Sequence, residues 1–314
     1  MYIGIDLGGT NIAAAFVDSD GVIMKRASLP TNASFGAKAI IDGLMNVCDS
    51  LISDVGKNPT AIGIGVPGTV NDEAGEVVFT PNLPFRNIKV TGEMREKFGC
   101  PVRLGNDANC AALGETVAGG AKGAQDVVFL TLGTGIGGGI ILNGRLLTGL
   151  SGAASELGHM VTMTGGRKCG CGRHGCWERY ASASGLIGTA IELMETQKDS
   201  MLWELCTGKP EEIDGKAIFD AFRAGDHTAH LTVERYTEHL AAGIVNIINM
   251  IDPEIICIGG GISNAWDCLA EPLQELIDKE KFFRFSPNAP QTKIVKAQLG
   301  NDAGIIGAAF LGRE

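Results

Sequence analysis

The sequence predicts an α/β protein of two domains, and three observations lead to this fold class. Predicted strands and helices alternate along most of the chain, as they do in α/β folds. A strand–glycine turn–strand pattern occurs twice, far apart in the sequence. The length of 314 residues is suitable for two domains of ordinary size.

The repeated pattern is a predicted β-hairpin. Residues 2–7 form a short apolar run, a glycine turn follows, and a second apolar run leads to a polar turn. Residues 5–17 align with residues 130–142 without a gap, and Gly8 falls opposite Gly133. We interpret the two hairpins as an internal duplication, with one copy in each domain.

The remaining elements follow the same alternation. A buried strand is predicted at 61–66, further strands at 101–105, 254–259 and 292–299, and helices at 107–115, 181–197, 214–226, 227–251 and 301–314. We expect the last helix to return to the first domain. The predicted domains are therefore residues 1–116 with 300–314, and residues 117–299, the second carrying the inserted segment that contains Cys169, Cys171 and Cys176.

Composition narrows the classes of function. Apolar residues make up 45% of the chain and charged residues 20%, so a buried core is expected. The net charge is −10 and no basic stripe is present, which argues against a nucleic-acid partner. No uncharged apolar run reaches the roughly 18 residues of a membrane span, and the start lacks a signal-peptide pattern. We expect a cytoplasmic protein that handles small molecules, whose nine cysteines are reduced or metal-bound.

The 45 glycines are about twice the usual ~7% share, and they form clusters at strand ends: DLGGTN, LGTGIGGG and IGGGI. Glycine turns let backbone N–H groups face an anion, so two facing hairpins predict a polyphosphate site. Thr10 and Thr134 would add hydroxyl donors, and Asp6 would lie near a divalent cation, through water. The alternative for each turn taken alone is an ordinary tight hairpin.

The segment LGNDANCAALGE places Asn106 and Asp107 in a turn between a strand and a helix. Transfer of a phosphoryl group to a hydroxyl needs a base beside the attacking oxygen, and a carboxylate serves this purpose. Asp107 is our candidate for that base. The alternative is that this turn only caps the helix, because Asn and Asp are favoured at N-caps.

Three cysteines, Cys169, Cys171 and Cys176, follow His159 in a glycine-rich segment. Four ligands of the Cys₃His type form closed, structural zinc sites, whereas catalytic zinc keeps an open position. His174 is a competing fourth ligand. Without a metal, the segment would hold three incidental thiols in a loop. A nucleic-acid finger is also conceivable, but it would need more basic surroundings.

These glycine turns resemble those of the superfamily that contains sugar kinases, Hsp70 chaperones and actin. The resemblance implies a two-domain actin-like, ribonuclease H-like ATPase fold with a cleft between the domains. It also implies two phosphate loops and a turn beside the adenosine. These are loop one, with Gly8, Gly9, Thr10 and Asn11; loop two, with Gly133, Thr134 and Gly135; and the adenosine turn, with Gly259, Gly260 and Gly261.

The run CGCGRHGCWE, together with ELGH and NDANCAALGE, resembles the ROK family (repressors, open reading frames, kinases), and the likeness covers essentially the whole chain. It implies that sugar hydroxyls contact Glu156, His159 and Glu178, and that Asn106 and Asp107 hold the hydroxyl that is phosphorylated. Gly68 and Asn82 would line the sugar cleft, and His159 would also bind zinc, with Cys169, Cys171 and Cys176. Ser155 replaces a glycine of the family pattern, which affects the expected loop geometry.

The resemblance implies ATP-dependent phosphorylation of a hexose, with glucose at its 6-hydroxyl as the first expectation. Its cofactors would be ATP, Mg²⁺ and a structural Zn²⁺. The alternatives are a kinase for mannose, fructose or an N-acetylhexosamine, and a sugar-sensing regulator without catalysis. The first predicted strand begins at residue 2, so we do not expect the DNA-binding helices that precede the sugar domain in such a regulator. A homo-oligomer, dimer or tetramer, is also implied.

Overall fold

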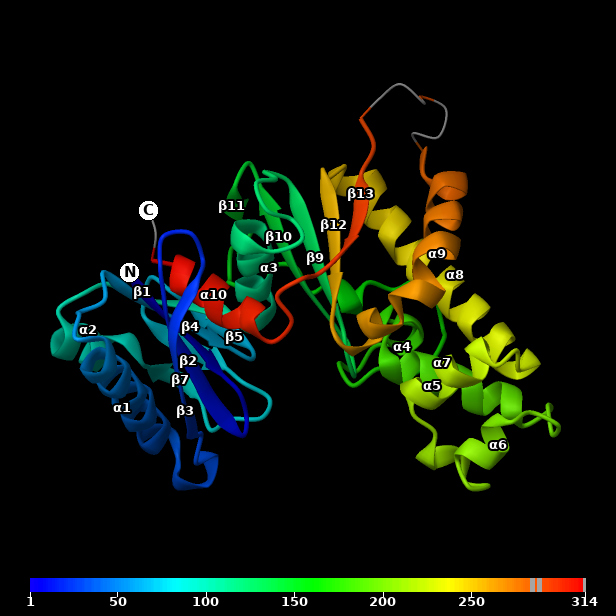
Figure 1. The fold of residues 1–314 in the computed structure, drawn as a ribbon, viewed down its shortest axis with the longest axis horizontal. Coiled ribbons are helices and arrows are strands. Elements are labelled where there is room, and N and C mark those ends of the chain that lie inside the picture. The colour runs from blue at the N-terminus through cyan, green and yellow to red at the C-terminus, as the bar shows by residue number, and fades with distance from the viewer. Residues whose placement is uncertain (283–285, 287–289, 313–314) are drawn as a thin grey trace.

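The computed structural model describes residues 1–282, 286 and 290–312. It has two similar β-sheets, with helices between them and on their outer sides (Figure 1). The strands of the first sheet are β1 (Tyr2–Leu7), β2 (Asn11–Val17), β3 (Ile23–Pro30), β4 (Ala61–Val66) and β8 (Val102–Asn106). Those of the second are β9 (Val127–Leu132), β10 (Ile136–Leu142), β11 (Arg145–Leu146), β12 (Ile255–Gly259) and β13 (Lys293–Lys296). A small sheet contains β5 (Thr69–Asn71), β6 (Glu76–Phe79) and β7 (Arg86–Lys89).

The helices occupy the connections between the strands. The α-helices are α1 (Ala37–Val55), α2 (Thr91–Phe98), α3 (Asp107–Ala118), α4 (Glu178–Ala181), α5 (Ala183–Met194), α6 (Leu202–Leu205), α7 (Gly215–Arg223), α8 (His227–Ile251), α9 (Trp266–Glu280) and α10 (Asp302–Phe310). The 3₁₀ helices are η1 (Ala33–Phe35), η2 (Leu157–His159), η3 (Pro210–Glu212) and η4 (Gly261–Ala265). No helix among the described residues is both long and apolar enough to cross a bilayer.

The two large sheets have the same topology, which confirms the predicted duplication. Their strand orders are β3-β2-β1-β4-β8 and β11-β10-β9-β12-β13. In each sheet the repeated hairpin is antiparallel, and its first strand pairs in parallel with the next strand along the order. The α/β class and the actin-like architecture are therefore confirmed.

The two hairpins differ in register by one residue. Leu7 pairs with Ile12 across the first turn, whereas Leu132 pairs with Ile136 across the second. The first turn therefore has one more residue between its last paired residues than the second turn has. The bounds of the strands themselves still align without a gap. The shorter turn closes with a hydrogen bond of 3.0 Å from the Gly133 N–H to the carbonyl of Gly135.

Helices α10 and α3 form the layer between the sheets (Figure 1). α10 packs on β1 and β4, and α3 packs on α10 and on β9 and β10. Each contact is a close approach of backbone at a glycine. A Cβ at Gly63 would lie 1.7 Å from the Ala308 carbonyl oxygen, one at Gly307 would lie 1.6 Å from that of Cys110, and one at Gly139 would lie 2.5 Å from the Ala112 side chain.

Composition had placed the glycines in turns and near ligands, and this interpretation was incomplete. The glycines just named lie inside strands and helices, where their role is to let layers pack closely. Turn glycines and packing glycines cannot be separated in a single sequence, because the neighbour that excludes a side chain is distant along the chain.

The longest helix that the structure describes, α8, belongs to the core of the second half. Its buried face packs against α5, α7 and α9. Gly243 on this face makes room for Trp177, because a Cβ there would lie 2.0 Å from the indole ring. Trp177 is fully buried and donates a hydrogen bond of 2.7 Å to the carbonyl of His239. The cysteine segment is therefore anchored in the core at its last turn.

The packing between α3 and α10 can be tested at Gly307. We expect Gly307→Ala to lower the free energy of unfolding by about 3 kcal/mol, since the added methyl group would overlap backbone that cannot move away. The measurement is guanidinium unfolding followed by circular dichroism. Gly92→Ala on α2 is the matched control, because no heavy atom of the described residues lies within 4 Å of its Cβ position, and we expect it to stabilise the protein by about 0.5 kcal/mol. Equal midpoints for Gly307→Ala and the unmodified protein would contradict this packing.

Candidate active site

The predicted site residues lie where parallel strands end. In the first sheet, β1, β4 and β8 are parallel, and Asp6, Gly68 and Asp107 lie at or just after their carboxyl ends. In the second sheet, β9 and β12 are parallel and are followed by loop two and the adenosine turn. Ligands of α/β proteins bind at this edge of the sheet. The topology therefore brings residues from five separate segments toward one region.

A cavity of about 1050 Å³ lies in this region. The predicted site residues that line it are Asp6, Asn82, Asp107, Gly133, Thr134, Gly135, Glu178, Gly259, Gly260 and Gly261. The predicted residues that are not part of its lining are Gly8, Gly9, Thr10, Asn11, Gly68, Asn106, Glu156 and His159. The cavity thus unites the two carboxylates of the first half with the glycine turns of the second.

The two aspartates carry perturbed pKa values. Burial, and secondarily the charge of Asp107, raises the pKa of Asp6 to about 6. Burial also raises the pKa of Asp107, and the charge of Glu156 adds to this rise, while the backbone N–H of Ala108 acts against it. Asp107 is exposed to the cavity, yet the surrounding protein removes enough of its hydration to raise its pKa. Carboxylates in such surroundings bind protons or cations more readily than they do in water.

Asn106 is the N-cap of α3, so the capping alternative applies to this residue. Its side-chain oxygen accepts a hydrogen bond of 3.1 Å from the N–H of Asn109. Its amide group donates one of 3.1 Å to the carbonyl of Gly68. The cap fixes the first turn of the helix and therefore the position of the neighbouring Asp107.

Loop two and the adenosine turn lie side by side. Gly260 has a φ of 84°, and a Cβ there would lie 2.5 Å from the backbone of Leu132, the last residue before loop two. Gly135 lies against Glu178, since its Cβ would come within 2.6 Å of Oε2 of that side chain. Only glycine fits this backbone conformation and this contact without displacing a neighbour.

Loop one is an exposed turn. Gly9, Thr10 and Asn11 are exposed, and Thr31 fixes the loop from the side by donating a 2.7 Å hydrogen bond to the carbonyl of Gly8. The N–H of Thr31 also donates to the carbonyl of Thr10, at 2.8 Å. The hydroxyl and the backbone N–H of Thr31 therefore both hold the loop, and its contact with phosphate stays a prediction.

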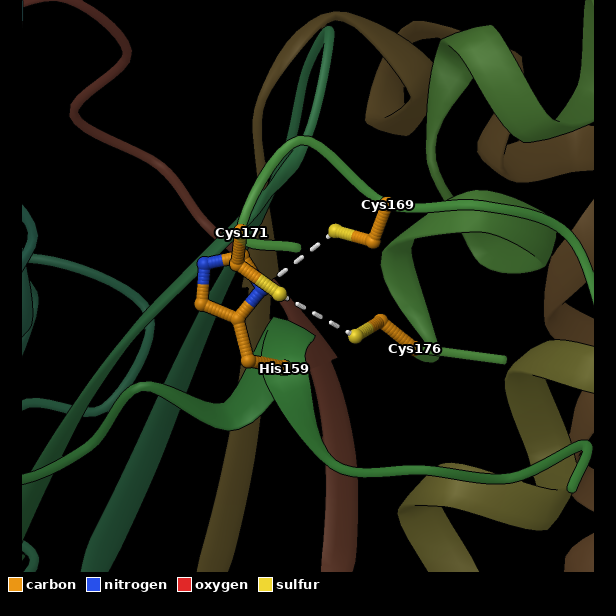
Figure 2. Close-up of side chains that lie close together, drawn as sticks. All are labelled: His159, Cys169, Cys171 and Cys176. Carbon is orange, nitrogen blue, oxygen red and sulfur yellow. Dashed lines mark hydrogen bonds between the residues drawn. The ribbon is translucent and has the colours of Figure 1, made fainter. Parts of the chain in front are cut away.

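His159, Cys169, Cys171 and Cys176 form one cluster (Figure 2), in which the possible ligand atoms all lie within 4.8 Å of one another. The Sγ atom of Cys169 is 3.7 Å from Nδ1 of His159, and the Sγ atoms of Cys171 and Cys176 are 3.6 Å apart. The competing ligand His174 is exposed and does not belong to this cluster.

These distances fit a tetrahedral zinc ion. Zinc bonds of typical length give edges of about 3.8 Å between two sulfurs and about 3.6 Å between a sulfur and a nitrogen. The observed separations of 3.6 and 3.7 Å are close to these edges. A disulfide would need sulfurs about 2 Å apart, so the thiols are not paired. Three thiols and one imidazole also complete the usual donor set of a structural zinc site.

The cluster adjoins the cavity through Glu178. Oε1 of Glu178 lies 2.9 Å from Sγ of Cys169 and 3.6 Å from Nδ1 of His159, while the residue itself lines the cavity. The adjacent Trp177 is buried in the core, and this fixes the start of α4. Arg167 stabilises the other side of the segment, because its guanidinium donates hydrogen bonds of 2.9 Å to the Arg179 carbonyl and 3.1 Å to the Thr189 hydroxyl.

Ser155, which replaces a glycine of the family pattern, has a φ of 70°. Left-handed backbone is costly for residues other than glycine, and its buried hydroxyl has no hydrogen-bond partner among the described residues. The loop nevertheless keeps the conformation that a glycine would favour. It leads into η2, which packs on β10 through Gly158 and carries His159 to the cluster.

Sequence reasoning missed part of the cavity wall. Glu115, on α3, is fully buried and lines the cavity, and the same wall contains Ser263, Asn264, Lys296, Gln298 and Asn301. One signal was available for Glu115, which is a carboxylate on the apolar face of a predicted helix, shortly before two glycines. The polar residues after β13 gave no such signal, because their segment has no motif.

Comparisons with known proteins agree with this geometry. A model of the ROK family matches residues 2–314. A glucokinase of Thermotoga maritima is 39% identical, with 99% of this chain and 97% of the relative covered. An N-acetyl-D-glucosamine kinase of Salmonella paratyphi A is 33% identical, with 99% of both covered. The crystal structure of a ROK glucokinase from Streptomyces griseus, in complex with glucose and AMPPNP, superposes with a TM-score of 0.79 at 35% identity, covering 99% of both chains. The chain therefore belongs to the ROK family.

Proposed function

We propose that this protein transfers the terminal phosphoryl group of ATP to a hexose, with glucose and its 6-hydroxyl as the preferred acceptor. The observation that carries the proposal is the cavity that joins Asp107 to two glycine turns and to Glu178. A hydroxyl acceptor needs a carboxylate base, and a polyphosphate donor needs free backbone N–H groups. The full-length relatives named above, with glucokinases among them, support the same activity.

In this mechanism Asp107 is the base. Its carboxylate accepts the proton of the sugar hydroxyl while the hydroxyl oxygen bonds to the terminal phosphorus. The bond from that phosphorus to the bridging oxygen breaks, and ADP leaves with the bonding electrons. The position of the base depends on the Asn106 cap, and the raised pKa of Asp107 makes it a better proton acceptor than an ordinary aspartate.

The carboxylate of Asp6 fits a site near a divalent cation. Its burial beside a second aspartate raises its pKa, and a positive charge would offset both effects. Magnesium bound with the nucleotide would neutralise charge on the phosphates. In the proposed division of roles, loops one and two hold the phosphates and the adenosine turn holds the nucleoside.

The zinc ion is proposed to be structural. His159 faces the thiols through Nδ1, so with zinc on that nitrogen, Nε2 must carry the proton and can only donate a hydrogen bond, for instance to a sugar oxygen. Glu178 contacts the same cluster and reaches the cavity. The cluster would therefore orient both sugar-binding side chains without contacting the reacting phosphate. Glu156 is proposed to bind the sugar beside them.

Three further features belong to the proposal. The division into residues 1–116 with 300–314, and residues 117–299, is proposed to let the two halves close over the sugar and exclude water. The protein is proposed to act in the cytoplasm and to form a dimer or a tetramer. A kinase for an N-acetylhexosamine is the second candidate, because the N-acetyl-D-glucosamine kinase relative covers the whole chain.

The activity is tested by ADP release with MgATP and a panel of glucose, mannose, fructose and N-acetylglucosamine. We expect the highest kcat/KM with glucose. Asp107→Asn should lower kcat by about a thousandfold with little loss of sugar binding, because the amide cannot accept the proton. Turnover with only another sugar would change the substrate and keep the mechanism. An absence of turnover with every sugar, in protein shown to contain zinc, would support the sugar-sensing alternative instead.

The zinc site is tested with Cys171→Ser. Cys171 is exposed, so its replacement removes a ligand without leaving a cavity in the core. We expect loss of zinc by mass spectrometry, lower thermal stability and a rise of about tenfold in the KM for the sugar. Cys100→Ser, outside the cluster, should change none of these. Normal sugar binding by a zinc-free Cys171→Ser protein would refute the proposed role.

The environment of Asp107 predicts a pH effect. A protonated Asp107 cannot act as base, so kcat should fall with decreasing pH at values above the ordinary aspartate pKa of about 4. Glu156→Gln removes a negative charge that raises this pKa, so the fall should move to lower pH. Glu271→Gln on α9 is the control and should leave the profile in place. A profile unchanged by Glu156→Gln would contradict the assignment of Asp107.

A further inference from the structure

Glu115 is a buried carboxylate with an unusual set of partners. It lies in the last full turn of α3 and is fully buried. Its oxygens accept a hydrogen bond of 2.7 Å from the N–H of Gly120, one of 2.8 Å from Leu299, and bonds of 3.0 and 3.1 Å from Gln298. Within the described part of the chain no side-chain cation joins these partners, so backbone N–H groups compensate the charge.

The partners belong to the two segments that connect the sheets. Gly120 lies between α3 and β9, where the chain first passes to the second sheet. Gln298 and Leu299 lie between β13 and α10, where it returns (Figure 1). Gly120 also lies against the end of β13, where the second segment begins, since a Cβ at Gly120 would lie 2.6 Å from the carbonyl oxygen of Lys296. One carboxylate therefore holds together the two segments through which the chain passes between the sheets, which we call the crossings.

The same crossings form a wall of the active-site cavity. Glu115 and Gln298 both line the cavity, and Asp107 lies at the other end of α3, eight residues earlier. A helix of this length is stiff, so its C-terminal anchor determines where its N-terminal residue points. The anchor thus fixes the distance between the proposed base and the wall on which the nucleotide would lie.

We propose that Glu115 is a positioning residue of the phosphoryl transfer, and that it holds α3 in register with the crossing after β13. In this role it acts through α3 and the crossing, and not by contact with the sugar or the phosphates. Burial of a carboxylate is costly unless every lone pair is used, and charge-assisted bonds to three N–H groups meet that condition. An amide of the same size would present its own N–H₂ group to one of those donors and lose the bond. This inference rests on the proposed function, because the effect that it predicts is on the kinase reaction.

The test is Glu115→Gln in the full-length, zinc-loaded protein. Hydrogen exchange should accelerate at least tenfold at the amides of Gly120, Gln298 and Leu299, and remain unchanged in the rest of both sheets. With MgATP and the best sugar, kcat should fall by at least about tenfold and the KM for ATP should rise, because small displacements of reacting groups are costly. Binding of the sugar alone, followed by tryptophan fluorescence, should change less than threefold.

Two further variants complete the test. Gly120→Ala keeps the carboxylate but pushes the crossings apart, so it should reproduce the lower kcat. If Glu115→Gln does not fold, this variant tests the positioning role in its place. Thr237→Val removes a buried 2.7 Å hydrogen bond on α8, far from the crossings, and controls for loss of stability alone. It should leave kcat unchanged.

The outcomes separate this inference from the proposed function. Faster exchange confined to the three amides, together with a lower kcat, supports it. Exchange that accelerates throughout both sheets, exchange that does not change, or a kcat equal to that of Thr237→Val, overturns it. An unmodified protein without kinase activity would instead overturn the proposed function, and with it the role of Glu115 in phosphoryl transfer.

Discussion

The rest of the structure depends on the close backbone packing through the middle of the molecule. Glycines bring the first sheet against α10, α10 against α3, and α3 against the second sheet. A methyl group at any of these contacts would overlap main-chain or side-chain atoms. Because packed interiors adjust little, this spacing sets how far the ends of the strands in one sheet lie from those in the other. The cavity between Asp107 and loop two depends on this distance between the strand ends.

A second constraint joins the cysteine segment to the catalytic region. Trp177 is held in the core by α8, and the next residue, Glu178, contacts the cluster on one side and Gly135 on the other. The orientation of Glu178, which we propose to bind the sugar, thus depends on the Cys₃His cluster and on a buried indole together. A short loop alone could not hold it, because an unsupported acidic side chain has several accessible rotamers.

The carboxylates of Glu115, Asp6 and Asp107 differ in how many N–H donors surround them, and their proposed roles differ accordingly. Glu115 is surrounded by N–H donors, which satisfy its oxygens and leave it inert. Asp6 and Asp107 have fewer such donors, lie near each other and face a cavity, so their pKa values rise. A carboxylate whose oxygens are filled by backbone N–H groups can therefore serve as a structural anchor, whereas Asp6 and Asp107, which face the cavity, are available for protons or cations.

The sequence by itself determined the class, the duplication and the local pieces of the site. Short-range patterns predicted the two hairpins, the Asp107 turn and the Cys₃His set, because residues close together in the sequence determine turn geometry and ligand spacing. Only the tertiary structure decided the one-residue difference in register, the packing role of Gly307 and the contacts of Glu115. The difference in register is local, but the gapless alignment of the two hairpins does not reveal it. The packing of Gly307 and the contacts of Glu115 with the segment after β13 depend on partners far away in the chain, and a residue does not record which distant backbone will approach it. The same reason explains why Gln298 carried no signal, although it lies in the wall of the cavity.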